Sequence, residues 1–270
     1  MPFVELEESE HAPGVRPVKI HYREVGLPAG NSGGRTIAFL HGGWGYGVYP
    51  IDRQIGAFGD RVRFVIPDRS GYGGSACVDG EMPTDFHRRA AVETIAVLDA
   101  LRIDRPILWG HSDGAVIAAM IGLMAPERCE RLILEAFHFY RVKPKSRRFF
   151  ERFHERPEDL GEETQGLLAA DHGEARWNHV VSRNTGAWIR IGDESVRSDE
   201  DLYDGRLSDL KVPTTFLHGE GDPRTEPDEM ERVARVILQA EVKFVERGQH
   251  SPHSEEGATE EFNLMMAGLI

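Results

Sequence analysis

The sequence has 270 residues, of which 40% are hydrophobic, and a formal net charge of −13. This length suits one large domain or two small ones with a sizeable core. The negative charge argues against nucleic acid and against an anionic membrane surface as partners, because both would repel the chain. No apolar run is long enough to span a bilayer. Segment 1–10 is acidic, whereas a signal peptide would begin basic and continue apolar.

These properties leave a small molecule as the expected partner and the cytoplasm as the expected location, while no pattern indicates an oligomeric state. The two cysteines, Cys77 and Cys129, are far apart in the sequence, so they predict neither a disulfide framework nor a metal site. The chain also lacks a closely spaced set of histidine and carboxylate ligands. We therefore expect no metal and no other cofactor.

Apolar segments alternate with helical patterns through the first half of the chain. This alternation, clearest between residues 60 and 136, predicts a parallel sheet with helices on both faces. Residues 1–17 are acidic and interrupted by proline, and we expect them to be poorly ordered; residues 26–34 predict a turn. Strands are expected at 18–25, 35–40, 62–67, 131–135 and from 106 towards Ser112, and helices at 51–58, 86–101 and directly after Ser112.

The alternating pattern stops after residue 136. Residues 137–208 are charged, aromatic and compatible with helices, with no clear strand. We interpret them as a helical cap inserted into a core made of residues 1–136 and 209–270, because strand and helix patterns resume afterwards. Those later elements are expected strands at 212–217 and 241–245 and helices at 227–238 and 255–270.

The segment 106–120 carries the main chemical signal. A short apolar run leads into Gly110-His-Ser112-Asp-Gly114, and small apolar residues suited to a buried helix follow. A serine on a sharp turn between a strand and a helix would present its hydroxyl above the sheet edge, with glycines where a Cβ would collide with neighbouring backbone. We therefore predict that Ser112 is a nucleophile.

A serine hydroxyl is a weak nucleophile at neutral pH and needs a base within hydrogen-bond reach. His250 is the predicted base because it directly follows the last strand; His253 is its competitor. Asp222 is the predicted acid that orients the imidazole, because it follows a strand between Ser112 and His250 in a loop with two glycines. Glu220 is the rival of Asp222, and an ordinary Asp-Pro turn is the alternative explanation.

Two backbone N–H groups are needed where negative charge develops on the substrate oxygen. One would belong to Asp113, the residue after the nucleophile. The other would belong to Gly43, in the glycine-dense loop after the strand at 35–40. These two amides form the predicted oxyanion hole.

Together, these segments resemble enzymes of the α/β-hydrolase fold superfamily. The chain order Ser112, Asp222, His250 is the order found in that superfamily and not in the other serine-hydrolase folds. The resemblance implies a mostly parallel central sheet flanked by helices, with an inserted helical cap. It covers about residues 18–136 and 209–270 and depends on the segments 41–45, 68–75, 110–114, 217–222 and 248–253.

The resemblance also implies a reaction type. Family members that open epoxides or remove halides attack with a carboxylate, so Ser112 disfavours those activities. A serine suits attack on an ester and hydrolysis of the resulting acyl-enzyme, and we expect an esterase without a cofactor. Two alternatives use the same three residues for carbon–carbon bond hydrolysis or for perhydrolysis of the haloperoxidase type. A further alternative, from another class, is a receptor-like module that binds a ligand.

The sequence Ser112-Asp113-Gly114 is similar to the valacyclovir-hydrolase-like branch, as are the cap fragments around 170–177 and 186–188. In that branch the acid after the nucleophile binds the α-amino group of an amino-acid ester. A carboxylate beside the acyl site would attract an ammonium group and repel an anion. The alternative is that Asp113 faces a helix terminus or an arginine and binds nothing. Trp44, Trp177 and Trp188 are the candidate residues for lining the substrate pocket.

Overall fold

The computed structural model describes residues 2–28 and 34–270. Its centre is one eight-stranded sheet with the strand order β1-β2-β4-β3-β5-β6-β7-β8. β1 and β2 pair antiparallel to each other, β2 pairs antiparallel to β4, and all other pairs are parallel. The strands are β1 Phe3–Leu6, β2 Val18–Gly26, β3 Arg35–Leu40, β4 Val62–Pro67, β5 Ile107–His111, β6 Arg131–Glu135, β7 Thr214–Gly219 and β8 Glu241–Val245.

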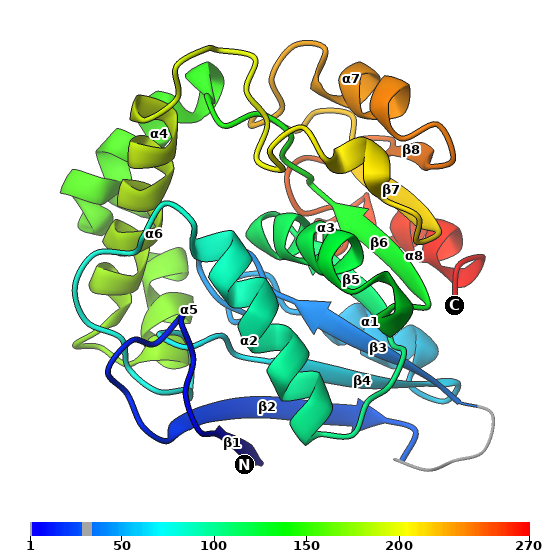
Figure 1. Ribbon diagram of the computed structural model, residues 1–270, viewed down its shortest axis with the longest axis horizontal. Coiled ribbons are helices and arrows are strands. Elements are labelled where there is room, and N and C mark those ends of the chain that lie inside the picture. Colours follow the sequence, from blue (N-terminus) through cyan, green and yellow to red (C-terminus); the bar gives the residue numbers. More distant parts are fainter. Residues whose placement is uncertain (1, 29–33) are drawn as a thin grey trace.

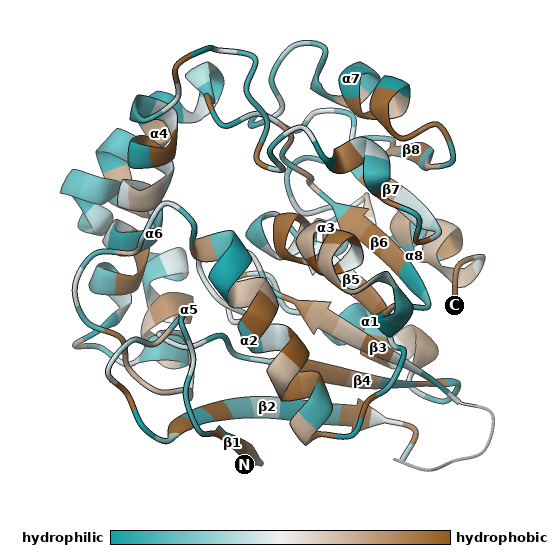
Figure 2. Ribbon diagram, viewed as in Figure 1, coloured by the Kyte–Doolittle hydropathy of each residue, from teal (hydrophilic) through white to brown (hydrophobic). Residues whose placement is uncertain are grey.

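Helices cover both faces of this sheet (Figure 1). Helices α2 (Phe86–Ala100) and α3 (Asp113–Met124) pack on one face, and α1 (Asp52–Phe58) and α8 (Thr259–Ala267) pack on the other. Side chains of β3 alternate between the two cores: Ala38 and Leu40 lie towards α2 and α3, and Ile37 and Phe39 lie towards α1 and α8. The central strands are thus apolar throughout, as buried parallel strands require, and Figure 2 shows this as brown strands in the middle of the sheet.

The predicted sheet with helices on both faces is confirmed, but the N-terminal expectation is wrong. Residues 3–6 form the edge strand β1, which pairs with β2 from Phe3 opposite His21 to Leu6 opposite Val18. Leu6 is buried there in a small cluster that includes Ile20 and Val97. β1 has only four residues, Phe-Val-Glu-Leu, and acids follow it directly, so its pairing with β2 becomes evident only from the fold. Most of the turn predicted at 26–34 lies outside the described residues.

Residues 137–208 carry three helices, α4 (Pro144–Glu155), α5 (Glu162–His172) and α6 (Trp177–Asp193), and no strand; a single β-bridge joins Tyr140 to Asp201. In Figure 1 these helices stand to the left of the sheet, at the end to which the parallel strands point. They lie over the carboxyl ends of the strands, where open α/β sheets bind ligands. We keep 137–208 as our interpretation of the cap.

The remaining helices differ from the prediction at their ends. Helix α7 spans Glu229–Val236, two residues later than the proline that we expected to start it, and α8 is shorter than the predicted 255–270. Three short 3₁₀ helices lie at Pro126–Arg128, Pro157–Asp159 and Leu207–Asp209. None of the helices within the described ranges is long and apolar enough to cross a membrane.

Candidate active site

Ser112 lies on a strained turn between β5 and α3. Its backbone angles are φ 55° and ψ −118°, a conformation that residues other than glycine rarely adopt. A Cβ at Gly114 would overlap the carbonyl group of Leu40, so the helix can approach β3 only with glycine at this position. The Ser112 N–H donates to the carbonyl oxygen of Glu135 at 2.9 Å, which fixes the turn against β6. The hydroxyl consequently faces a cavity beneath the cap.

His250 and Asp222 meet Ser112 from two other loops. The distance from His250 Nε2 to Ser112 Oγ is 3.1 Å, and His250 Nδ1 lies 3.0 Å from each carboxylate oxygen of Asp222. The Gly221 N–H donates to the Gly248 carbonyl at 2.9 Å and ties the two loops together. The structure therefore brings the three predicted catalytic residues within hydrogen-bond reach of one another, in a serine–histidine–carboxylate arrangement.

Asp222 is suited to hold the imidazole in one tautomer. Burial alone would raise the pKa of its carboxyl, but the charge and hydrogen bond of His250 outweigh burial and lower this pKa well below its usual range. The ionised carboxylate accepts from Nδ1–H of His250, which leaves Nε2 free to accept the proton of Ser112. The rival acid, Glu220, is exposed to solvent.

His253, the competitor of His250, has a different environment. Its side chain is completely buried, with Nδ1 2.7 Å from Glu135 Oε1 and Nε2 3.1 Å from the carbonyl oxygen of Tyr49. Burial acts to lower the pKa of His253, yet the facing Glu135 carboxylate raises it above the ordinary value of 6.5. Both nitrogens therefore donate to protein acceptors. His253 is committed to the core and makes no contact with Ser112.

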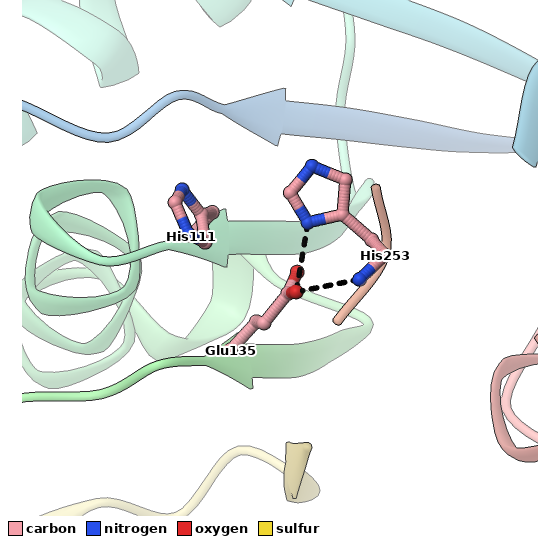
Figure 3. A group of neighbouring side chains, drawn as sticks. All are labelled: His111, Glu135 and His253. Carbon is pink, nitrogen blue, oxygen red and sulfur yellow. Dashed lines mark hydrogen bonds and ion pairs between the residues drawn. The ribbon is translucent and has the colours of Figure 1, made fainter. Parts of the chain in front are cut away.

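His111, Glu135 and His253 also form a buried group whose ligand atoms lie within 4.8 Å of one another, so we tested them as a metal site. Figure 3 shows that Glu135 is bonded to both the ring and the backbone of His253, and that His111 stands apart from these bonds. His111 Nε2 lies 3.1 Å from the carbonyl oxygen of His250 and 2.9 Å from Ser251 Oγ. In this group, Glu135, both ring nitrogens of His253 and Nε2 of His111 already pair within the protein, and the unpaired Nδ1 of His111 lies beside Gly42. Its chemistry is that of a hydrogen-bonded support for the His250 loop.

The predicted oxyanion amides belong to Gly43 and Asp113. Asp113 is the first residue of α3, so its N–H has no acceptor within the helix. Among residues 2–28 and 34–270, neither amide has a hydrogen-bond acceptor. Arg69 holds the two residues before Gly43 in place by donating to the carbonyl oxygens of His41 and Gly42. Both amides are therefore available for a developing oxyanion, which stays our prediction for their role.

The Asp113 side chain is buried and faces the cap rather than a helix terminus or an arginine. Its Oδ1 accepts from Trp188 Nε1 at 2.9 Å and lies 3.3 Å from His87 Nε2, while its Oδ2 accepts from Asn184 Nδ2 at 2.7 Å. Burial alone would raise the pKa of Asp113, but His87 first, and then the charge of Arg69 and the hydrogen bond of Asn184, lower it. Asp113 is thus an ionised carboxylate that joins the core to α6.

The cavity above Ser112 is small, about 20 Å³, which is space for one water molecule. Of the predicted pocket residues, Trp44 and Trp188 line it. Trp177 does not: it packs in a hydrophobic cluster with Trp44, Phe153 and Leu168 and does not reach the cavity lining. Helical spacing in the cap predicts an apolar face but does not say whether that face meets the cavity or the neighbouring cap helices.

Six of the lining residues escaped the sequence analysis, among them His138 and Arg224. His138, three residues after the end of β6, places Nε2 3.3 Å from Ser112 Oγ, and burial lowers its pKa well below the ordinary value. Arg224, two residues after Asp222, contributes its guanidinium to the cavity. Both follow the carboxyl end of a parallel strand, and that position is the signal that could have identified them.

Comparison with known families places these observations in context. Residues 37–262 match the alpha/beta hydrolase family. Among curated proteins, the serine hydrolase BPHL of Homo sapiens is 23% identical over 262 residues, covering 95% of this chain and 84% of that protein. An epoxide hydrolase of Caballeronia sordidicola is 34% identical, but only over 113 residues, or 41% of this chain and 32% of that enzyme.

Solved structures agree on the fold. A thermophilic esterase from Thermogutta terrifontis superposes with a TM-score of 0.71 at 19% identity, covering 100% of this chain and 98% of the esterase. At this level of identity the likeness extends to the fold alone.

Proposed function

Because the chain belongs to the alpha/beta hydrolase family, we propose that this hydrolase is a serine esterase that cleaves a small carboxylic ester through an acyl-enzyme on Ser112. The single observation that carries the proposal is the continuous chain of contacts from Ser112 Oγ to His250 Nε2 at 3.1 Å and from His250 Nδ1 to Asp222 at 3.0 Å. A relative named as a serine hydrolase, matched over 95% of this chain, supports the same reaction type.

The geometry supplies each step of such a reaction. His250 Nε2 accepts the Ser112 proton as Oγ attacks the ester carbonyl, and Asp222 stabilises the imidazolium that forms. The amides of Gly43 and Asp113 donate to the tetrahedral oxyanion. The imidazolium then protonates the leaving alcohol. In the second half-reaction His250 takes a proton from the water that attacks the acyl group, and the imidazolium returns this proton to Ser112 Oγ as the acid product leaves.

A hydroxyl at position 112 distinguishes this proposal from epoxide opening, although curated epoxide hydrolases match part of the chain. Epoxide opening by this family uses a carboxylate that forms an ester with the substrate, and Ser112 cannot take that part. The match covers less than half of this chain and 32% of that enzyme, so it does not carry epoxide opening over to this protein.

An α-amino-acid ester is the finer candidate for the substrate, with Asp113 as the ligand of its ammonium group. The carboxylate of Asp113 lies at the cavity, which supports this candidate. Three protein groups already contact its oxygens, so one of about four lone-pair sites is left for a substrate. The cavity volume of about 20 Å³ also means that lining side chains must move before any ester enters.

The test is a panel of methyl esters with cationic, neutral and anionic acyl groups, hydrolysed by the wild type, Ser112→Ala and Asp113→Asn. Saturable turnover by the wild type and a loss of several orders of magnitude in Ser112→Ala are expected. A larger loss for amino-acid esters than for neutral esters in Asp113→Asn would support the ammonium site. A folded wild-type protein that turns over no ester would overturn the esterase proposal and favour a ligand-binding role.

A further inference from the structure

The charged groups around the cavity differ in how well the protein satisfies them. Asp113 is the lining carboxylate, and it receives contacts from three side chains. Arg224 is the lining cation. Within the described part of the chain, no carboxylate lies within ion-pair distance of its guanidinium, and none of its side-chain N–H groups donates a hydrogen bond. The unmatched charge at this cavity is therefore positive.

Aromatic rings hold the Arg224 guanidinium in place. Its central carbon lies 3.8 Å from the ring centre of Phe149 and 5.7 Å from that of Trp44, and these two rings stack on each other at 5.4 Å. Stacking engages the flat face of a guanidinium and leaves its N–H groups, which point outwards in the plane, unpaired. Arg224 is half-buried, and burial lowers the pKa of its guanidinium.

The acceptors near Arg224 do not pair with its guanidinium. Asp222, two residues away, accepts from His250 with both oxygens and from the backbone N–H of Arg224 at 2.9 Å. The Arg224 backbone thus orients the predicted catalytic acid while its side chain extends to the rings of Trp44 and Phe149. Burial raises the pKa of Tyr49, another lining residue, so its phenol stays neutral. The site has five donors in a rigid fork and no protein acceptor for them.

We propose that Arg224 is the anchor for a substrate carboxylate, so that the preferred ester carries a second, ionised carboxyl group: the half-ester of a short dicarboxylic acid. An α-amino group on the same acid is compatible with this site, because it would be bound by Asp113 and not by Arg224. A carboxylate fits the planar fork of a guanidinium with two parallel hydrogen bonds. This inference rests on the esterase proposal for the reaction, but the anion site itself can be tested without turnover.

The experiment compares monomethyl glutarate with methyl hexanoate, a neutral ester of similar length. The enzymes are the wild type, Arg224→Gln and Arg235→Gln; Arg235 is an exposed arginine of α7 without an ion pair among the described residues, so it controls for the loss of one charge. We expect the ratio of kcat/KM for the anionic ester to that for the neutral ester to fall about 10- to 100-fold in Arg224→Gln, as expected when a charged hydrogen-bond partner is lost. Arg235→Gln should keep the wild-type ratio.

Calorimetric titration with glutarate separates this proposal from the esterase proposal. Glutarate should bind the wild type and Arg235→Gln equally well and Arg224→Gln at least about 10-fold more weakly. Such binding without ester turnover would support the anion site while overturning the esterase proposal. If both esters are turned over and the ratio of their kcat/KM values is the same in wild type and Arg224→Gln, the anion site is overturned and the esterase proposal stands. Glutarate binding that does not depend on Arg224 would also overturn the anion site.

Discussion

Two histidine–carboxylate pairs lie three residues apart on the loop after β8, and they have opposite surroundings. His250 pairs with Asp222 beside the cavity and directs its other nitrogen to Ser112. His253 pairs with Glu135 in the core and directs its other nitrogen to a backbone carbonyl. The comparison shows that a histidine next to a carboxylate is not by itself a catalytic base. What matters is whether one nitrogen remains available to exchange a proton with a reacting group.

The largest expected effect is on activity when the pair at the cavity loses its histidine. His250→Gln should lower kcat for a neutral methyl ester by about 10⁵- to 10⁶-fold, because the Ser112 proton then has no acceptor. Initial-rate measurements at neutral pH check this value, with circular dichroism to verify folding. A loss of less than about 10-fold in kcat would contradict the assignment of His250 as the base.

Asp222→Asn should have a somewhat smaller effect, about 10⁴-fold on kcat, because an amide favours the wrong imidazole tautomer but leaves the contact geometry in place. The same assay measures it. Glu135→Gln is the matched control, since it changes the carboxylate of the other pair in the same way. Equal losses of kcat in the two folded variants would remove the distinction between the pairs.

The pair in the core should act on stability instead. His253→Gln leaves the buried Glu135 without its partner and should lower the free energy of unfolding by about 3 kcal/mol. The folded-state pKa of His253 is raised above 6.5. Its stabilising contribution is therefore fully present below pH 6.5 and is lost as the pH rises through the folded-state pKa. Urea unfolding measures the free energy of unfolding of wild type and His253→Gln from below pH 6.5 upwards. The difference between the two free energies should shrink with increasing pH.

A difference between wild type and His253→Gln that grows with pH would mean that the buried histidine is neutral in the folded protein. Such a result would contradict the ion pair with Glu135.

The smallest expected effect concerns His138, the second histidine beside Ser112. Burial lowers its pKa well below the ordinary value, so it stays neutral and can donate from Nε2 to Ser112 Oγ. Loss of one neutral hydrogen bond in His138→Ala should lower kcat/KM about 3- to 10-fold. In the His250→Gln background, His138→Ala should lower kcat/KM by no more than this factor. A rate in His250→Gln that depends strongly on His138 would show that the two histidines can substitute for each other.

Much of the core could be predicted from the sequence because its signals are local. Strands at 35–40, 62–67 and 131–135 were expected with the bounds that the structure has, since each is a buried apolar run between turn residues. Ser112 could be singled out because the glycines at 110 and 114 are required by close backbone contacts across the turn. The catalytic role of Ser112 remains a prediction.

The rest depends on contacts between residues distant in sequence. β1 forms only because β2 offers a partner edge, and Trp188 and Asn184 reach Asp113 only because α6 folds back over the sheet. Trp177 and Trp188 lie on the same helix and could not be told apart by type, yet only Trp188 faces the cavity. Arg224 looks like an ordinary loop residue until the rings of the cap are placed against it.

The most direct test of the central claim is to identify the acylated residue. Wild-type protein and Ser112→Ala are mixed with a p-nitrophenyl acyl ester, quenched in acid during turnover, and analysed by intact mass and peptide mapping. The account predicts one acyl group per wild-type chain, located on the peptide that contains Ser112, and none on Ser112→Ala. Turnover at wild-type rates by Ser112→Ala, or an acyl group located on another residue, would contradict it.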